Sequence, residues 1–201
     1  MEIRNMAQYK KGAQDRSAVL VFLDEAGFSE RPPVRRTWAK RGVTPIIRHH
    51  FNWSRINTIG AITCKPDGSN PGLLLHLQRT SISKESIVAF LEALHKEVAG
   101  QIVLLWDGLP AHKSIVVKEH ILTNKDWLTV ERFPAYAPEI NPVEYLWAAF
   151  KNKDVANFCC DSIDQVQCKL ILAAERVQNT KTLLTGFLRK SGLFGDTGFV
   201  T

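Results

Sequence analysis

Two aspartates directly follow strongly apolar stretches of the chain. Asp24 ends the run AVLVFLD, and Asp107 comes after IVLLW. Both runs are typical of buried strands, and ligands of an open α/β sheet gather at the carboxyl ends of its strands. If the strands are parallel neighbours, the two carboxylates lie side by side and repel each other unless they share a proton or a cation. Hard oxygen ligands of this kind favour Mg²⁺ or Mn²⁺.

A third carboxylate, Glu144, has two interpretations. It lies in FPAYAPEINPVEYLW, residues 133–147, where a proline-containing loop leads into an apolar helix pattern. With Asn141 as N-cap and Pro142 as the first helical residue, Glu144 takes the third position, where it would complete an Asn version of the capping box. On a helical wheel it lies about 90° from the centre of the apolar stripe, so it can also reach strand-end acids. The sequence leaves both roles open, and they can coexist in part.

Three acids on an α/β frame suit two-metal phosphoryl transfer. In that chemistry two ions about 3.5–4 Å apart activate the attacking oxygen and stabilise the leaving one. Asp24, Asp107 and Glu144 are therefore the predicted catalytic residues and the predicted ligands of two Mg²⁺ or Mn²⁺ ions.

The elements that would position these acids alternate between strands and helices. The predicted strands cover residues 18–24, 55–64, 73–80, 102–106 and 127–133. The predicted helices cover residues 83–98, a short stretch after Ser114, residues 142–158, residues 162–177 with a Ser162–Gln165 capping box, and residues 181–189. Three early strands in an antiparallel meander, followed by strand–helix–strand units, predict a mixed α/β sheet flanked by helices.

Composition excludes several classes of protein. The 201 residues suit one domain, and 45% apolar with 23% charged residues is an ordinary globular mixture. No apolar run approaches the roughly 18 residues of a membrane span, and the polar start of the sequence has no signal-peptide core. The four cysteines contain no CxxC pair, which favours reduced thiols in a cytoplasmic protein over a zinc site or a disulfide framework.

Positive charge is concentrated in one segment. Seven of the 26 Lys and Arg residues lie between Arg31 and Arg55, a stretch without Asp or Glu, so the remaining 19 basic residues are matched by 20 acidic ones. Such a patch indicates a polyanionic partner, although a solvated, charged hairpin would have the same composition. Trp38 within it either anchors that hairpin, stacks on DNA or packs against a partner subunit. The predicted DNA-binding residues are Arg31, Arg35, Arg36, Lys40, Arg41 and Arg48.

Three blocks together resemble the catalytic domain of the DDE transposases, in the bacterial insertion-sequence branch of the mariner-like superfamily. The blocks are VFLDEAGFS around Asp24, LLWDGLPAHKS around Asp107 and FPAYAPEINPVEYLW around Glu144, with 36 residues between the second and third acids. The resemblance implies a ribonuclease-H-like fold, a Mg²⁺ pair, DNA cleavage at transposon ends and strand transfer into target DNA. It also implies a homodimer on DNA, in the bacterial cytoplasm with the nucleoid.

The resemblance has departures. After the second acid the family often has Asn-Ala-Pro, whereas this chain has Gly108, Leu109 and Pro110, although His112 keeps its usual offset. His112 and Asn141 are predicted to support the metal ligands. Such transposases normally carry N-terminal helix-turn-helix modules, so we expect a separately encoded half of a split enzyme, or a truncated copy. The predicted division is a polar lead-in (1–17), a catalytic domain (18–193) with a basic hairpin insertion (29–55), and a tail (194–201).

Two other functions stay open at this point. One is a different ribonuclease-H-like nuclease, such as a resolvase or an RNA–DNA hybrid nuclease, against which the NPVE block argues. The other is an inactive or non-autonomous remnant that only binds DNA, against which the presence of all three acids argues.

Overall fold

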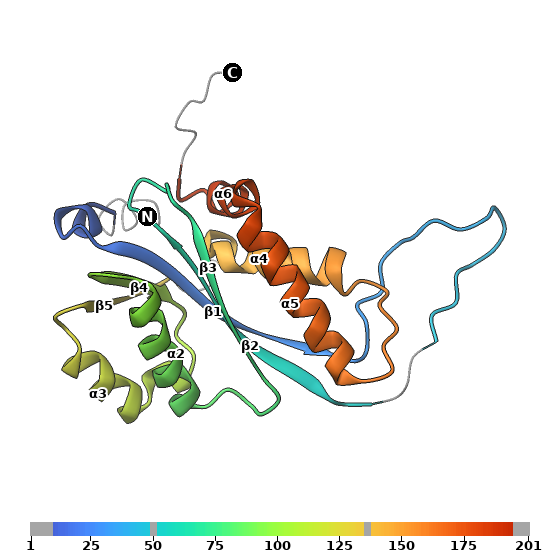
Figure 1. The fold of residues 1–201 in the computed structure, drawn as a ribbon, viewed down its shortest axis with the longest axis horizontal. Coiled ribbons are helices and arrows are strands. Elements are labelled where there is room, and N and C mark those ends of the chain that lie inside the picture. The colour runs from blue at the N-terminus through green and yellow to red at the C-terminus, as the bar shows by residue number, and fades with distance from the viewer. Residues whose placement is uncertain (1–9, 49–51, 135–137, 195–201) are drawn as a thin grey trace, which may run out of the picture.

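A five-stranded mixed sheet separates two groups of helices (Figure 1). The computed structural model describes residues 10–48, 52–134 and 138–194. The sheet order is β3-β2-β1-β4-β5, in which β1, β2 and β3 are antiparallel neighbours and β4 and β5 run parallel to β1. The strands are β1 (Val19–Ser29), β2 (Arg55–Cys64), β3 (Gly72–Gln78), β4 (Ile102–Trp106) and β5 (Leu128–Arg132). The predicted fold class, an antiparallel meander followed by parallel strands, is confirmed.

Both faces of the sheet are covered, which explains why its central strands read as continuous apolar runs. Side chains alternate between the faces of β1. Leu20 and Phe22 belong to one core cluster, and Val21 and Leu23 belong to the other. The first core includes helices α4 (Pro142–Ala149), α5 (Ile163–Asn179) and α6 (Lys181–Lys190); the second includes α2 (Lys84–Glu97) and α3 (Ile115–Thr123).

Shorter helical turns lead into the two helices closest to the predicted acids. Ala111–Lys113 and Pro138–Ile140 are 3₁₀ turns before α3 and α4, and α4 continues into a π-helix at Phe150–Asp154. Residues 10–15, before β1, are helical as well.

Three local predictions need correction. Strand β1 does not end at Asp24, because its pairing with β2 continues to Ser29 and Arg55. The helix predicted for 142–158 changes to π geometry at Phe150. The Ser162–Gln165 capping box does not form, since the Ser162 side chain makes no cap bond and the Gln165 amide oxygen accepts from the Asp161 N–H instead.

The basic segment forms an irregular arm that projects from the end of β1 and returns into β2 (Figure 1). We call residues 30–54 the basic arm. Its described parts, 30–48 and 52–54, contain no strand, so the segment predicted as a basic hairpin is irregular there rather than strand-paired. Asn157 anchors the arm: its N–H donates to the Pro33 carbonyl at 3.0 Å, and its side chain exchanges two hydrogen bonds, of 2.8 and 2.9 Å, with the backbone of Arg35.

The predicted domain division stays a prediction. Residues 1–9 of the lead-in, 49–51 of the basic insertion, 135–137 before α4 and 195–201 of the tail lie outside the described residues. None of the helices in the described ranges combines the length and apolar character that crossing a membrane would require.

Candidate active site

Asp24 lies on β1 and faces α4. The indole Nε1 of Trp147 donates a hydrogen bond to Asp24 Oδ2 at 2.9 Å. The pKa of Asp24 is raised to about 7, chiefly by burial and then by the nearby charge of Glu144, and the Trp147 hydrogen bond offsets only part of this rise. Asp24 is therefore a half-buried acid held beside a second acid, which is an environment that a cation would stabilise.

Glu144 lies in the first turn of α4 and is exposed. The predicted N-cap is confirmed, because Asn141 Oδ1 accepts the Val143 N–H at 3.1 Å. The reciprocal half of the capping box is not made, since the Asn141 N–H donates to the Pro138 carbonyl at 3.0 Å. The Glu144 carboxylate takes no hydrogen bond from any described residue, so a role restricted to capping is wrong and the group is available to a ligand.

Asp107 follows β4 at the level of Asp24. Phe22 of β1 pairs with Leu105 of the parallel strand β4, and each aspartate comes two residues later. Leu109 N–H and His112 Nδ1 both contact Asp107 Oδ1, at 3.0 and 3.1 Å. Oδ2 has no hydrogen-bond partner among the described residues, which leaves it available as a metal ligand.

His112 links Asp107 to another acid, Glu25. The His112 ring is 2% exposed and stacks on Trp106 with centroids 4.0 Å apart and planes 4° from parallel. Nε2 lies 2.9 Å from Glu25 Oε1, and Nδ1 lies 3.1 Å from both the carboxylate and the backbone oxygen of Asp107. Because these oxygens are acceptors, both ring nitrogens donate.

The electrostatics of this cluster agree with its hydrogen bonds. Burial alone would lower the pKa of His112, but the bonds to Asp107 and Glu25 outweigh it and raise the pKa to about 9. Burial would likewise raise the pKa of Asp107, but the hydrogen bonds from His112 and the Leu109 N–H hold it below its usual value. His112 is therefore a buried cation between two carboxylates.

The described residues contain one group of three whose ligand atoms all lie within 4.8 Å of one another: Glu25, Asp107 and His112. Of the three predicted metal ligands, only Asp107 belongs to this group. All donors of the predicted set, Asp24, Asp107 and Glu144, are carboxylate oxygens. The all-oxygen donor set still fits Mg²⁺ or Mn²⁺, whereas both nitrogens of His112 are already engaged.

Comparison with known proteins decides the family. The sequence model of the DDE superfamily endonucleases matches residues 19–167, which is most of the chain. The chain belongs to the DDE superfamily endonucleases. The predicted DDE family is thus confirmed, whereas its bacterial insertion-sequence branch stays a prediction. No curated protein sequence matches this DDE endonuclease.

Solved structures of the Mos1 mariner transposase share the fold. The Mos1 paired-end complex with the left transposon end matches at 18% identity and a TM-score of 0.61, over 94% of this chain and 55% of that one. A Mos1 paired-end complex with Mn matches at 18% identity and a TM-score of 0.62, over 92% of this chain and 55% of that one. The Mos1 catalytic domain matches at 15% identity and a TM-score of 0.57, over 96% of this chain and 86% of that one. The ribonuclease-H-like fold is confirmed, and the chain spans about half the length of the first two relatives.

Sequence reasoning missed two residues of the DDE endonuclease site. The apolar helix pattern gives no functional role to Trp147, yet this residue donates to Asp24. The available signal is its position three residues after Glu144, on a neighbouring part of the helix surface. Glu25 is not among the predicted site residues, although it follows Asp24 directly. Its partner His112 is 87 positions away, and no local pattern connects the two.

The six predicted DNA-binding residues do not lie among the acids but on the basic arm, where all six are exposed. None of them forms an ion pair with an acid in the described ranges. Arg35 is partly engaged, since its Nε donates to Asn152 Oδ1 at 2.6 Å. Trp38 is fully exposed, so its predicted role as a hairpin anchor is wrong.

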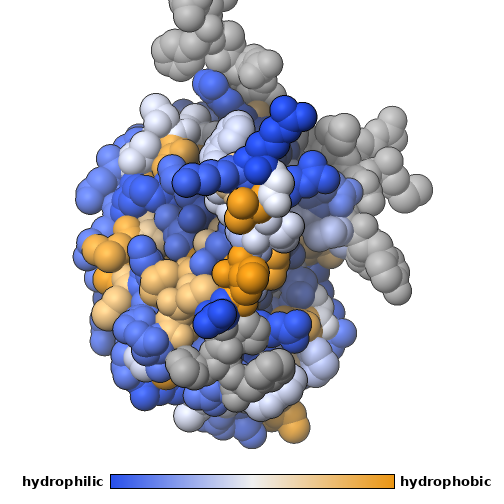
Figure 2. Space-filling view, turned by 90° about the vertical axis from the view of Figure 1, so that its right-hand side faces the viewer, coloured by the Kyte–Doolittle hydropathy of each residue, from blue (hydrophilic) through white to orange (hydrophobic). Residues whose placement is uncertain are grey.

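Exposed apolar side chains accompany these cations. Figure 2 views the molecule from the side on which the arm projects, and hydrophobic groups stand there among hydrophilic ones. The exposed aliphatic side chains of the arm are those of Val34, Val43 and Ile46, each more than half exposed.

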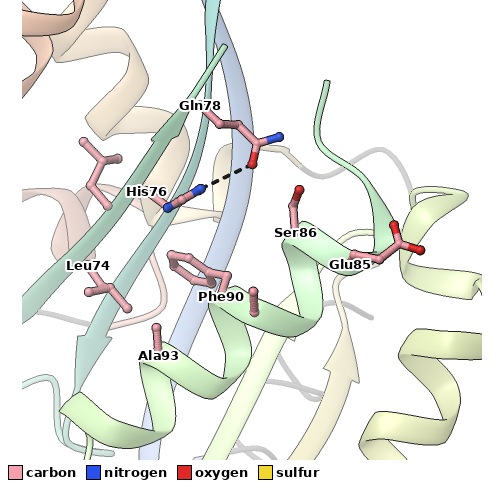
Figure 3. A pocket seen from close by; sticks show the side chains of 9 residues that line it. Leu74, His76, Gln78, Glu85, Ser86, Phe90 and Ala93 are labelled. Atoms are coloured by element: carbon pink, nitrogen blue, oxygen red, sulfur yellow. Dashed lines mark hydrogen bonds between the residues drawn. The ribbon is translucent and has the colours of Figure 1, made fainter. Parts of the chain in front are cut away.

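A separate hollow of about 520 Å³ lies between β3 and α2, away from the predicted residues (Figure 3). Leu74 and Phe90 form its apolar wall, and His76 contacts Gln78 at 3.2 Å on its rim. The hollow contains none of the predicted site residues.

Proposed function

We propose that this DDE endonuclease is a transposase catalytic domain that cleaves DNA at transposon ends and transfers the strand into target DNA. Asp24, Asp107 and Glu144 would hold two Mg²⁺ or Mn²⁺ ions. The observation that carries the proposal is the placement of Asp24 and Asp107 at one level of the neighbouring parallel strands β1 and β4, in a chain that the DDE endonuclease model matches over residues 19–167. An acid pair of this kind is costly unless a cation binds to it.

Each acid has its own support from the chain. Trp147 orients Asp24 through one carboxylate oxygen, and His112 orients Asp107. Asn141 caps α4, and its Nδ2 lies 3.5 Å from the Leu23 carbonyl, which ties the helix start to β1 beside Asp24. Bound divalent ions would supply charge stabilisation at the reacting phosphodiester and lower the pKa of an attacking water.

DNA would approach along the basic arm. Its cations can offset the repulsion between a phosphodiester backbone and three carboxylates. At the base of the arm a cleft of about 240 Å³ is lined by residues that include Arg31, Pro33 and Lys151. We add Lys151, from the π-helix that continues α4, to the proposed phosphate contacts.

The remaining parts of the proposal concern assembly. The exposed apolar groups of the arm, with Trp38, favour a partner surface, and we propose that two copies assemble on DNA. Recognition of the transposon ends by a helix-turn-helix half stays a prediction. The bacterial insertion-sequence origin and the location with the nucleoid stay predictions.

A cleavage and joining assay tests this function. Purified chain, with and without Mg²⁺ or Mn²⁺, is incubated with duplex DNA and with an RNA–DNA hybrid, and both nicks and joined products are measured. Transposase chemistry predicts metal-dependent nicks together with joined ends. Cutting without joining, or a preference for the hybrid, would instead favour another ribonuclease-H-like nuclease, and binding without cutting would favour an inactive remnant.

A further inference from the structure

Glu25 is an acid of the site cluster that the three-carboxylate arrangement does not use. We propose that Glu25 is a positioning residue, which acts through His112 to fix the carboxylate of Asp107 for metal binding. The proposal rests on the proposed function, since it requires Asp107 to be a metal ligand.

The geometry of β1 separates Glu25 from the other acids. Successive side chains on a strand point to opposite faces. Asp24 contacts Trp147 of α4, whereas its neighbour Glu25 contacts His112, on the face that carries Trp106. One strand therefore supports two acids of the site in different ways: it carries Asp24 itself, and through Glu25 it reaches Asp107.

The His112 ring is held at three points. Trp106 covers one face, Glu25 accepts from Nε2 at 2.9 Å, and Asp107 accepts from Nδ1. Stacking alone restrains the plane of the ring but does not distinguish the two orientations that a half-turn about the Cβ–Cγ bond interchanges. The bond to Glu25 selects one of these orientations, so Nδ1 stays directed at Asp107, with the backbone oxygen as its hydrogen-bond acceptor and Oδ1 also 3.1 Å away. Asp107 Oδ2 is left without a hydrogen-bond partner among the described residues.

Glu25 has no other described partner that would explain its burial. Its side chain is 11% exposed, and Oε2 is fully buried without a hydrogen bond among the described residues. A buried carboxylate is a poor means of stabilising a fold, because apolar residues of similar volume often serve as well or better. Its single bond to His112 is therefore the feature that distinguishes Glu25 from such a residue.

The experiment measures Mn²⁺ affinity of the full chain without DNA, from the electron paramagnetic resonance of free Mn²⁺. Removal of a residue that orients a metal ligand typically weakens metal binding about 10–100-fold. We expect this loss for Glu25→Ala and also for Glu25→Met, which fills the volume without accepting a hydrogen bond. Glu25→Gln keeps an acceptor for Nε2, so its affinity should stay within a few-fold of the parent.

A double-mutant cycle tests whether Glu25 acts through His112. If Glu25 acts only through His112, then Glu25→Ala combined with His112→Ala should bind Mn²⁺ no more weakly than His112→Ala alone. Glu139→Ala is the matched control, because it removes an exposed acid from the turn before α4 without touching His112. It should leave Mn²⁺ affinity unchanged.

Several results would overturn the proposal. Equal losses in Glu25→Gln and Glu25→Ala would make Glu25 a metal ligand itself, and additive losses in the cycle would exclude action through His112. Unchanged Mn²⁺ affinity in Glu25→Met, with only a lower urea midpoint, would make the role structural. Asp107→Asn separates this from the proposed function: if that variant binds Mn²⁺ like the parent, the metal assignment fails independently of Glu25.

Discussion

Gly60 is the residue opposite Asp24 on β2, and replacing it by alanine should damage the site from a distance. A Cβ at position 60 would lie 2.5 Å from Cη2 and 2.8 Å from Cζ2 of Trp147. Trp147 is the residue whose indole N–H holds Asp24. Gly60 therefore provides the space that the Asp24 hydrogen bond requires.

The size of the effect follows from these distances. Ordinary contact begins at 3.4 Å, so the indole must move by about 1 Å. The ring is buried and packs edge-on against Phe28 and Phe150, each with centroids 6.0 Å away, and cannot move without disturbing both. Overpacking of this kind costs about 1–3 kcal/mol. A displacement of about 1 Å in a positioned group costs roughly 10²-fold in rate.

The assay compares Gly60→Ala with Gly186→Ala in urea unfolding and in Mg²⁺-dependent DNA cleavage. Gly186 lies inside α6 with nothing within 4 Å of its added Cβ, so the same substitution there should stabilise the fold by about 0.5–1 kcal/mol. Strand propensity also favours alanine over glycine at position 60. Gly60→Ala with parental stability and parental rate would refute the role assigned to Trp147.

Three further predictions concern the arm and the cysteines. Changing Arg35, Arg36, Lys40 and Arg41 together to alanine should make the slope of log K against log salt shallower by up to about 3.6, with Mn²⁺ affinity retained. Fluorescence anisotropy on duplex DNA measures this slope, and an unchanged slope would exclude the arm from the DNA path. Asn157→Gly tolerates the positive φ of 54° but deletes two side-chain hydrogen bonds to the Arg35 backbone. Trypsin should therefore cleave within residues 31–48 faster than in the parent, and equal cleavage rates would show that Asn157 does not hold the arm. At pH 8 a thiol reagent should label the exposed Cys159 and Cys168. The buried Cys160 and Cys64 should react only in urea, and burial also raises the pKa of Cys64 to about 12. Rapid labelling of all four cysteines would contradict the packing.

The sequence predicted strands well where apolar runs end at clear boundaries. IVLLW has the predicted bounds because Asp107 and a glycine turn at Gly100 flank it. The end of β1 could not be predicted, since the continuation to Ser29 depends on pairing with β2 rather than on its own pattern. The arm differs for the opposite reason: its prolines and glycine favour a turn, but none of its described residues pairs with a strand.

The site shows the same division between local and distant information. The N-cap at Asn141 was predictable from Asn-Pro alone. The absence of the capping-box bond from Glu144 was not predictable from the local sequence. It depends on the Pro138 carbonyl, which accepts the Asn141 N–H. The partners of Asp24 and Glu25, which are Trp147 and His112, come from segments 123 and 87 residues away.

Glu144→Gln tests the central claim most directly. Glutamine preserves the size of the side chain and its fit to the first turn of α4, but it removes the charge that a metal ligand requires. The measurement is the initial rate of Mg²⁺-dependent DNA nicking at saturating metal, with the urea midpoint of the same preparation. We predict a rate at least about 10²-fold below the parent with an unchanged midpoint. A parental rate would contradict the assignment of Glu144, and with it the three-carboxylate metal site.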